Sequence, residues 1–153
     1  MAILGERGLS GIVKRFLDLV FIGGIGIYLG LPVILRWYFD LIYRISSENY
    51  HFLLGFLYIT GIFCLVIMHE LRKVFKTLNR RNPFMMDNVK SLKRIAISSF
   101  SISAAYVVKM IFYNSFLTVI IAMVFIIAGL FSIIFSELFR QAVQVKEEND
   151  LTI

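Results

Sequence analysis

The sequence predicts an all-α integral membrane protein, a four-helix bundle that forms a single membrane domain over residues 1–153. Two observations predict this class. Apolar residues make up 59% of the chain and charged residues only 17%, whereas soluble domains have about 45–50% and ~25%. Four stretches are also apolar enough to cross a hydrocarbon core of about 30 Å, which takes roughly 20 residues of helix.

The first two predicted spans lie in the N-terminal half. Residues 16–35 form the first, and Asp18, close to one end, is its only charged residue. Residues 52–68 form the second, which contains no charge. Because this span is short, flanking residues, tilt or local thinning of the bilayer must complete it. Between the two, the aromatic segment 36–50 suits the membrane interface, where we expect it to lie along the surface as a short helix or turn.

The last two spans follow each other closely. Residues 95–112 are rich in serine and carry Lys109, and residues 116–135 carry no charge. A single helix over residues 95–135 would be about 60 Å long at ~1.5 Å per residue, twice the thickness of the membrane core. The chain must therefore turn, and Tyr113-Asn114-Ser115 is the predicted turn because Asn tolerates the left-handed conformation.

The positions of the basic residues predict the orientation. All but three of the 16 basic residues fall in the N-terminal segment 1–15, the loop 69–94 or the tail 137–153. The three exceptions are Arg36, Arg44 and Lys109. Because basic residues accumulate in cytoplasmic loops, both termini and the loop 69–94 are predicted to lie in the cytoplasm.

The loop 69–94 is predicted to be a helical hairpin. Apolar residues recur at helical spacing in its first half, at Leu71, Val74, Phe75 and Leu78. The second span is therefore expected to continue as a helix beyond the membrane. Asn82 and Pro83 read as the N-cap and first-turn proline of the helix that follows. After the fourth span, residues 137–148 are expected to form a short interfacial helix or an extension of the fourth helix.

The hairpin and the tail hold the candidate binding residues. The basic candidates are Arg72, Lys73, Lys76, Arg80, Arg81, Lys90, Lys93 and Arg94, and the acidic candidates of the tail are Glu147, Glu148 and Asp150. Basic side chains beside a bilayer attract anionic lipids by about 1 kcal/mol each, and docking of a cytoplasmic partner is the alternative. The acidic tail is expected to fold back on the hairpin or to present a peptide to a partner. Direct nucleic-acid binding is not expected, since no DNA-binding module is recognisable.

Inside the spans, glycines and a few polar residues stand out. Gly26 and Gly30 form a G-x-x-x-G pair, with Gly23 close by, which allows close helix packing. We favour packing within the bundle, and the alternatives are a homo-oligomer seam and a moving helix. Lys109 is either functional or reaches the interface with its long side chain. Ser101 and the neighbouring hydroxyls either line a polar cavity or pack closely.

No residue pattern supports catalysis. His69-Glu70 begins like the zinc motif H-E-x-x-H, but Lys73 stands where the second histidine belongs. The chain also has no glycine-rich phosphate loop, nucleophile elbow or Cys/His metal spacing. We therefore expect no enzyme, no cofactor and no metal, and the single cysteine excludes an internal disulfide.

Two motifs resemble those of a known family. Asn82-Pro83-Phe84, with Asn88 and the run Leu92-Lys93-Arg94-Ile95, resembles the central motif of bacterial membrane proteins catalogued as domain-of-unknown-function family 2975. The closing segment 146–153 is similar to the C-terminal signature of that family, and the resemblance covers nearly the whole chain. It implies a four-span protein of the bacterial cytoplasmic membrane, often encoded beside a small helix-turn-helix regulator, with no assigned catalytic residues.

The leading hypothesis is therefore a regulatory or accessory membrane protein that tethers, or signals to, a small DNA-binding regulator. One alternative is a transport, efflux or immunity-type protein that holds a small hydrophobic or cationic compound. Another is a structural subunit of a membrane complex. Ion-coupled carriers usually hold several ionisable groups inside their spans, and the scarcity of such groups here favours regulation.

Overall fold

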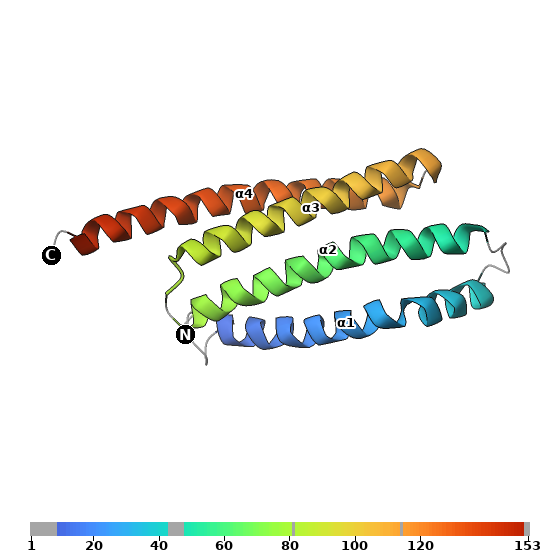
Figure 1. The fold of residues 1–153 in the computed structure, drawn as a ribbon, viewed down its shortest axis with the longest axis horizontal. Coiled ribbons are helices and arrows are strands. Elements are labelled where there is room, and N and C mark those ends of the chain that lie inside the picture. The colour runs from blue at the N-terminus through green and yellow to red at the C-terminus, as the bar shows by residue number, and fades with distance from the viewer. Residues whose placement is uncertain (1–8, 43–47, 81, 114, 152–153) are drawn as a thin grey trace.

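The computed structural model describes residues 9–42, 48–80, 82–113 and 115–151, and the side-chain surroundings of all of these except residues 9, 42, 48, 49, 150 and 151. This part of the chain forms four α-helices and no strand (Figure 1). They are α1 (Leu9–Ile42), α2 (Glu48–Asn79), α3 (Met86–Phe112) and α4 (Phe116–Leu151). Each is long and apolar enough to cross a membrane. The predicted all-α protein with four spans is confirmed.

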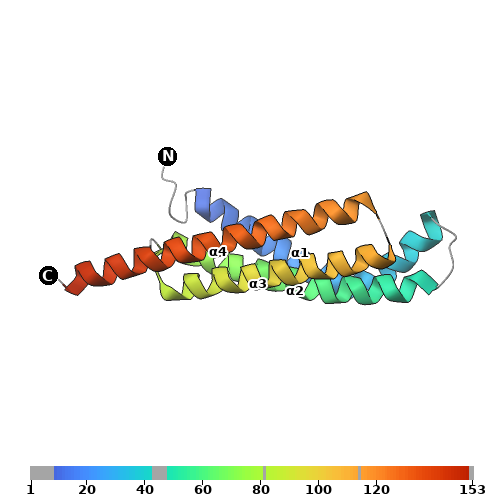
Figure 2. The ribbon, with the colours of Figure 1, turned by 90° about the horizontal axis from the view of Figure 1, so that it is seen from above.

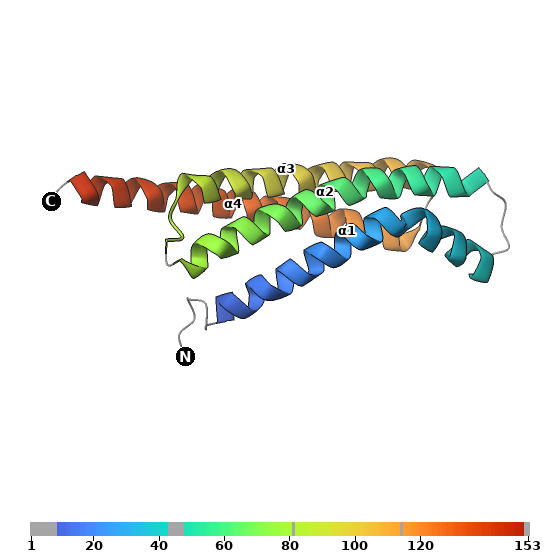
Figure 3. The same cartoon turned by 60° about the horizontal axis from the view of Figure 1, so that its bottom comes forward.

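The helices lie in chain order. α1 packs on α2, α2 on α3 and α3 on α4, as Figure 3 shows from below. Over the described residues, α1 and α4 make no close backbone contact, so the bundle is open between them. α1 is held to α2 near both ends, because Arg72 donates a hydrogen bond to Asp18 and the Tyr50 hydroxyl donates to the carbonyl of Pro32 at 3.2 Å.

The two ends of the bundle differ in what they bring together. α1 and α3 begin, and α2 and α4 end, at the same end of the molecule, on the left in Figure 1. We call this the hairpin end, because the turn between α2 and α3 lies there, and the opposite end the far end. α3 ends at Phe112 and α4 begins at Phe116, so the turn predicted at residues 113–115 is confirmed in position, although Asn114 lies outside the described residues.

The helices are longer than the predicted spans. At ~1.5 Å per residue, α2 is about 48 Å long and α4 about 54 Å, which exceeds the ~30 Å core of a bilayer. The second span does continue as a helix, to Asn79. The tail is an extension of α4, which runs on past the beginning of α3 (Figures 1 and 2).

Two local expectations are wrong. Of the predicted surface segment 36–50, residues 36–42 do not form a separate element, because α1 continues through them without a break, and residues 43–47 lie outside the described residues. α3 begins at Met86 rather than after Asn82, and its N-cap residue, Met85, makes no side-chain capping bond. The reason lies one turn inside the helix, where the side-chain amide of Asn88 donates to the carbonyl of Pro83 at 2.6 Å and so holds the loop in a non-helical path.

The tightest packing joins α3 and α4. A Cβ atom at Gly129 would lie 2.9–3.1 Å from the ring of Phe100, so only glycine lets the ring lie this close. The Ser103 hydroxyl donates to the carbonyl of Ala122 across the same interface, at 3.0 Å. Small residues thus let two helices approach closely, as is common in membranes.

Candidate functional site

A buried carboxylate joins α2 to α3 at the hairpin end. The side chain of Glu70, on α2, is only 4% exposed. It accepts hydrogen bonds from the Ser91 hydroxyl at 2.6 Å, from Arg94 at 3.0 Å and from Lys73 at 3.3 Å. Burial raises the pKa of this carboxyl, but the bonds from Ser91, Arg94 and Lys73 outweigh that effect and hold the pKa below its ordinary value.

A second polar cluster fixes the turn itself. Asn88 is 1% exposed, and its amide donates to the Thr77 hydroxyl at 2.7 Å as well as to Pro83. The Thr77 hydroxyl in turn donates to the carbonyl of Val74 at 2.7 Å. Buried polar groups that are satisfied in this way hold one arrangement, since breaking any bond leaves a group unpaired. These bonds therefore hold the last turn of α2 and the start of α3 in one arrangement.

The basic candidates fall into two groups. Arg72, Lys73 and Arg94 form ion pairs within the chain, Arg72 with Asp18 and the other two with Glu70. The pairs of Arg72 and Arg94 therefore join α2 to α1 and α3 to α2, whereas Lys73 and Glu70 both lie on α2. The described candidates that form no ion pair with another described residue are Lys76, Arg80, Lys90 and Lys93, and all four are exposed. The hydrogen bonds from Arg140 and Gln141 lower the pKa of Glu137, and the nearby charge of Lys93 adds to this effect. Arg81 lies outside the described residues.

A cleft opens between α2 and the loop that leads into α3. It measures about 480 Å³, and its lining includes three cations, Lys73, Lys76 and Arg80, but only one carboxylate, Asp87. This charge favours an acidic group over a cation as the occupant. Among the residues described, no group of His, Cys, Asp and Glu could hold a metal ion.

Apolar side chains lie beside this cleft. Met85 lines it, and Phe84 and Met86 next to Met85 are 44% and 47% exposed. The ring of Phe84 also contacts that of Phe139 on α4, with centroids 5.8 Å apart. The hairpin end thus combines exposed cations with exposed apolar anchors.

The tail of α4 lies along the loop but does not fold back on the hairpin. Lys146 donates to the side chain of Asn82 at 3.1 Å. Glu147 and Glu148 are exposed on the continuing helix, whereas the side chain of Asp150 lies outside the described part. The fold-back that we considered is therefore replaced by a helix that passes the loop, because α4 is not interrupted after Ser136.

The polar residues of the spans lie in different surroundings. Lys109 is half-buried at the far end, and its ammonium lies 4.9 Å from the ring centroid of Phe56 and 5.7 Å from that of Tyr106. Ser101 donates to the carbonyl of Ile97 in its own helix, at 2.9 Å. Ser99, one of the neighbouring hydroxyls, is buried, and its hydroxyl has no hydrogen-bond partner among the residues that the structure describes.

Gly23, Gly26 and Gly30 of α1 do not pack against another helix in the described part of the chain. A Cβ atom at Gly23 or Gly26 would meet nothing within 4 Å, and one at Gly30 would meet only Ile34 of the same helix. Packing within the bundle, which we favoured for these glycines, is therefore wrong for the described residues. Gly24 faces α2 instead, and a Cβ atom there would lie 3.4 Å from the side chain of Leu65.

Sequence reasoning missed Glu70, Asn88 and Ser91 as the residues that organise the hairpin. The spacing of Glu70 could have revealed its role. Glu70 stands four residues before Val74, which is buried, so both residues lie on the same helical face. A carboxylate on an otherwise buried face requires partners, and these come from residues 91 and 94 across the turn.

Comparison with known proteins identifies one family. A protein-family model described as "Protein of unknown function (DUF2975)" matches residues 28–153. No curated protein and no solved structure matches the chain.

Proposed function

This chain belongs to the DUF2975 family, which is described as of unknown function, and we propose that it is a non-enzymatic regulatory membrane protein. In this proposal the hairpin end lies in the cytoplasm of a bacterium and binds a small cytoplasmic DNA-binding regulator. The protein holds that regulator at the cytoplasmic membrane or relays a signal to it. The observation that carries the proposal is the basic cleft, bordered by helices that buried hydrogen bonds hold together, beside exposed apolar residues.

Two of the three cations of the cleft are available to a partner, because Lys73 is paired with Glu70. Lys76 and Arg80 are exposed and form no ion pair with another described residue. Their backbone is fixed, because Glu70 and Asn88 hold the two helices at the turn. A preorganised cluster of charges loses less conformational entropy on binding than a flexible one. The cleft therefore suits an acidic segment on the surface of the regulator.

The position of the cleft favours a protein over a lipid head group. Arg80 follows the predicted span 52–68 by twelve residues, which in a helix corresponds to about 18 Å. The head-group layer adds only about 5–8 Å on each side of the hydrocarbon core. Phe84, Met85 and Met86, which are exposed around the cleft, would supply the apolar anchors of a protein interface.

Crosslinking in native membranes, followed by purification of the tagged protein, tests the proposal. The intact chain is compared with the double variant Lys76→Glu/Arg80→Glu and with a chain that ends after Lys146. We expect the intact chain to capture a small DNA-binding protein, and the double variant to capture about tenfold less, because charge reversal places like charges against the acidic segment. The truncated chain shows whether the acidic tail contributes to the same contact.

Arg15→Glu is the matched control. Arg15 is exposed on α1, at the same end of the molecule but outside the cleft, and the control reverses one basic charge there, whereas the double variant reverses two. We expect the control to capture as much regulator as the intact chain. Equal capture by the double variant and the intact chain would overturn the proposal. Recovery of lipid alone would assign the basic residues to lipid binding and topology instead.

A further inference from the structure

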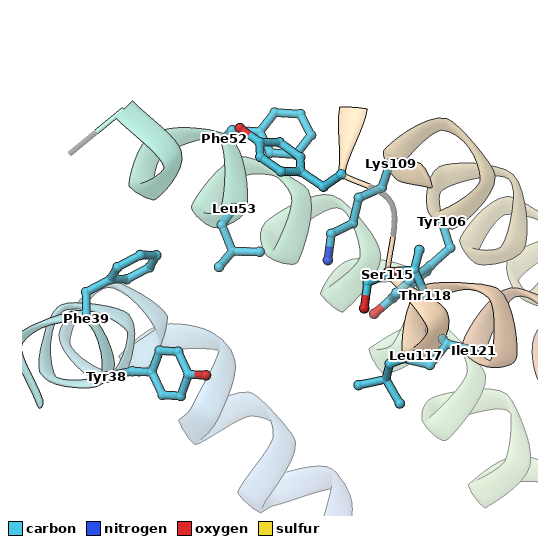
Figure 4. A pocket seen from close by; sticks show the side chains of 11 residues that line it. Tyr38, Phe39, Phe52, Leu53, Tyr106, Lys109, Ser115, Leu117, Thr118 and Ile121 are labelled. Carbon is cyan, nitrogen blue, oxygen red and sulfur yellow. The ribbon is translucent and has the colours of Figure 1, made fainter. Parts of the chain in front are cut away.

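A second cavity lies at the far end, where all four helices contribute to its walls (Figure 4). It measures about 490 Å³. The walls are mostly apolar and aromatic and include Phe39 of α1, Phe52 of α2 and Tyr106 of α3. The proposed regulator site lies at the opposite end, so nothing that follows depends on it.

Lys109 is the only charged side chain among the described residues that line this cavity. Figure 4 shows its ammonium pointing into the space between the helices. The rings of Phe56 and Tyr106 stabilise the cation, but it forms no ion pair with a carboxylate of the described residues. A cation near the end of a span without a carboxylate partner makes the cavity electropositive.

The first turn of α4 adds to this potential. α4 begins at Phe116, and the carbonyl of Ser115 accepts the first backbone bond, from Thr118, at 2.9 Å. The N-terminus of a helix carries partial positive charge and binds anions. Thr118 is 4% exposed, lines the cavity and makes no hydrogen bond through its hydroxyl to another described residue. Figure 4 shows its side chain and that of Ser115 on the same side of the cavity as the Lys109 ammonium.

We propose that this cavity binds an amphiphile with an anionic head group, either a phosphate or a carboxylate. The head group pairs with the Lys109 ammonium and accepts a hydrogen bond from Thr118 at the start of α4. The apolar chain lies against Leu117 and Phe39 on the side where α1 and α4 leave the bundle open. A cationic compound, which was one alternative from the sequence, is disfavoured here because it would meet Lys109 and the positive end of α4.

Native mass spectrometry of the full chain, purified in a non-ionic detergent, tests this site. The probes are phosphatidylglycerol, palmitate and the zwitterionic phosphatidylcholine, and each is added separately. We expect phosphatidylglycerol, palmitate or both to bind about tenfold more tightly than phosphatidylcholine, as charge-assisted hydrogen bonds require. Selective binding of phosphatidylglycerol identifies a bilayer lipid as the source of the head group, and selective binding of palmitate identifies a free fatty acid.

Three variants and one control locate the binding. Lys109→Met should lose the preference for the anionic probes, and Lys109→Arg should keep it because the charge remains. Thr118→Val, which preserves shape, should weaken anionic binding about threefold and tests the site even if Lys109→Met does not fold. Arg36→Gln removes a basic residue on α1 that does not line the cavity, so binding should not change. Equal affinity for all three probes, or equal losses in Lys109→Met and Arg36→Gln, would overturn the proposal.

Discussion

At the scale of single residues, Glu70 stands out because it occupies a position where α2 is otherwise buried. Its side chain is 4% exposed and takes three hydrogen bonds, two of them from cations. Lys73 and Arg94, which supply these cations, remain 47% and 58% exposed. The charge of Glu70 is thus compensated locally, while its partners stay hydrated. Such an arrangement joins α2 to α3 without a buried cation.

Glu70→Gln should destabilise the protein by about 1.5–3 kcal/mol, the range for hydrogen bonds to charged groups. The amide keeps the shape of the side chain but removes the negative charge that Arg94 and Lys73 contact. The free energy of unfolding, measured by titration with a denaturing detergent in micelles, checks this. Glu137→Gln is the matched control, because Glu137 is exposed and its hydrogen bonds to other described residues come from Arg140 and Gln141 of its own helix. A loss as large in the control would contradict the role assigned to Glu70.

The intact protein and Glu70→Gln should also differ in how their stability responds to acid. Glu70 follows the predicted span 52–68, and its pKa is lower in the folded protein than its ordinary value of 4.5. As the pH falls, the Glu70 carboxyl is therefore protonated at a higher pH in the unfolded chain than in the folded protein. The stabilisation from Glu70 is complete above pH 4.5 and is lost as the pH falls through the folded-state pKa below that value. The difference in unfolding free energy between the intact chain and Glu70→Gln should shrink below pH 4.5, and a constant difference would contradict this.

At the scale of the helices, the interface of α3 and α4 depends on one small residue. Gly129→Ala would place a methyl group 2.9–3.1 Å from the ring of Phe100, which forces the ring or the helix to shift. Gly55→Ala, in α2, would meet nothing within 4 Å. Both changes raise helix propensity equally, so their difference isolates the steric effect. We expect Gly129→Ala to be less stable than Gly55→Ala by about 1–3 kcal/mol, the usual cost of overpacking, in the same detergent titration.

The helices were predictable from the sequence because their signal is local. Apolar stretches of sufficient length predicted the four spans, and helical spacing from Leu71 to Leu78 predicted the extension of α2. The start of α3 was not predictable in the same way. Asn82 and Pro83 look like a helix start, but the tertiary bond from Asn88 to Pro83 overrides this local preference. The ion pairs were not predictable in this way either, because some of them join residues of different helices, such as Arg72 and Asp18.

At the scale of the whole molecule, the two candidate sites lie at opposite ends of the bundle. The basic cleft and the tail of α4 lie at the hairpin end, and the cavity of Lys109 lies at the far end. The sequence predicted that the basic hairpin and Lys109 would be separated by the membrane. It did not predict the cavity, because its walls come from four helices that are distant in the sequence. Whether the two sites face the proposed compartments depends on the orientation of the bundle.

Labelling of single cysteines in intact cells tests this orientation. Cys64 is the only cysteine, so Cys64→Ala gives a background without thiols. Asp40→Cys and Lys90→Cys then place one thiol at an exposed position at each end, on α1 and α3. Because nearly all basic residues fall at the hairpin end and in the segments that adjoin it, a membrane-impermeant maleimide should label Asp40→Cys in intact cells. Lys90→Cys should react only after permeabilisation.

The result of the labelling experiment also tests the proposed function. If Lys90→Cys is labelled in intact cells and Asp40→Cys is not, the hairpin end lies outside the cytoplasm, where no DNA-binding regulator could reach Lys76 or Arg80. The proposed function would then fail, whereas the anion site at Lys109 would remain and would face the cytoplasmic leaflet. With the expected labelling, the cleft faces the cytoplasm and the cavity faces the outer leaflet. An amphiphile bound at Lys109 would then contact α3 and α4, and toward the hairpin end the same α4 contacts the loop before α3 through Phe139 and Phe84.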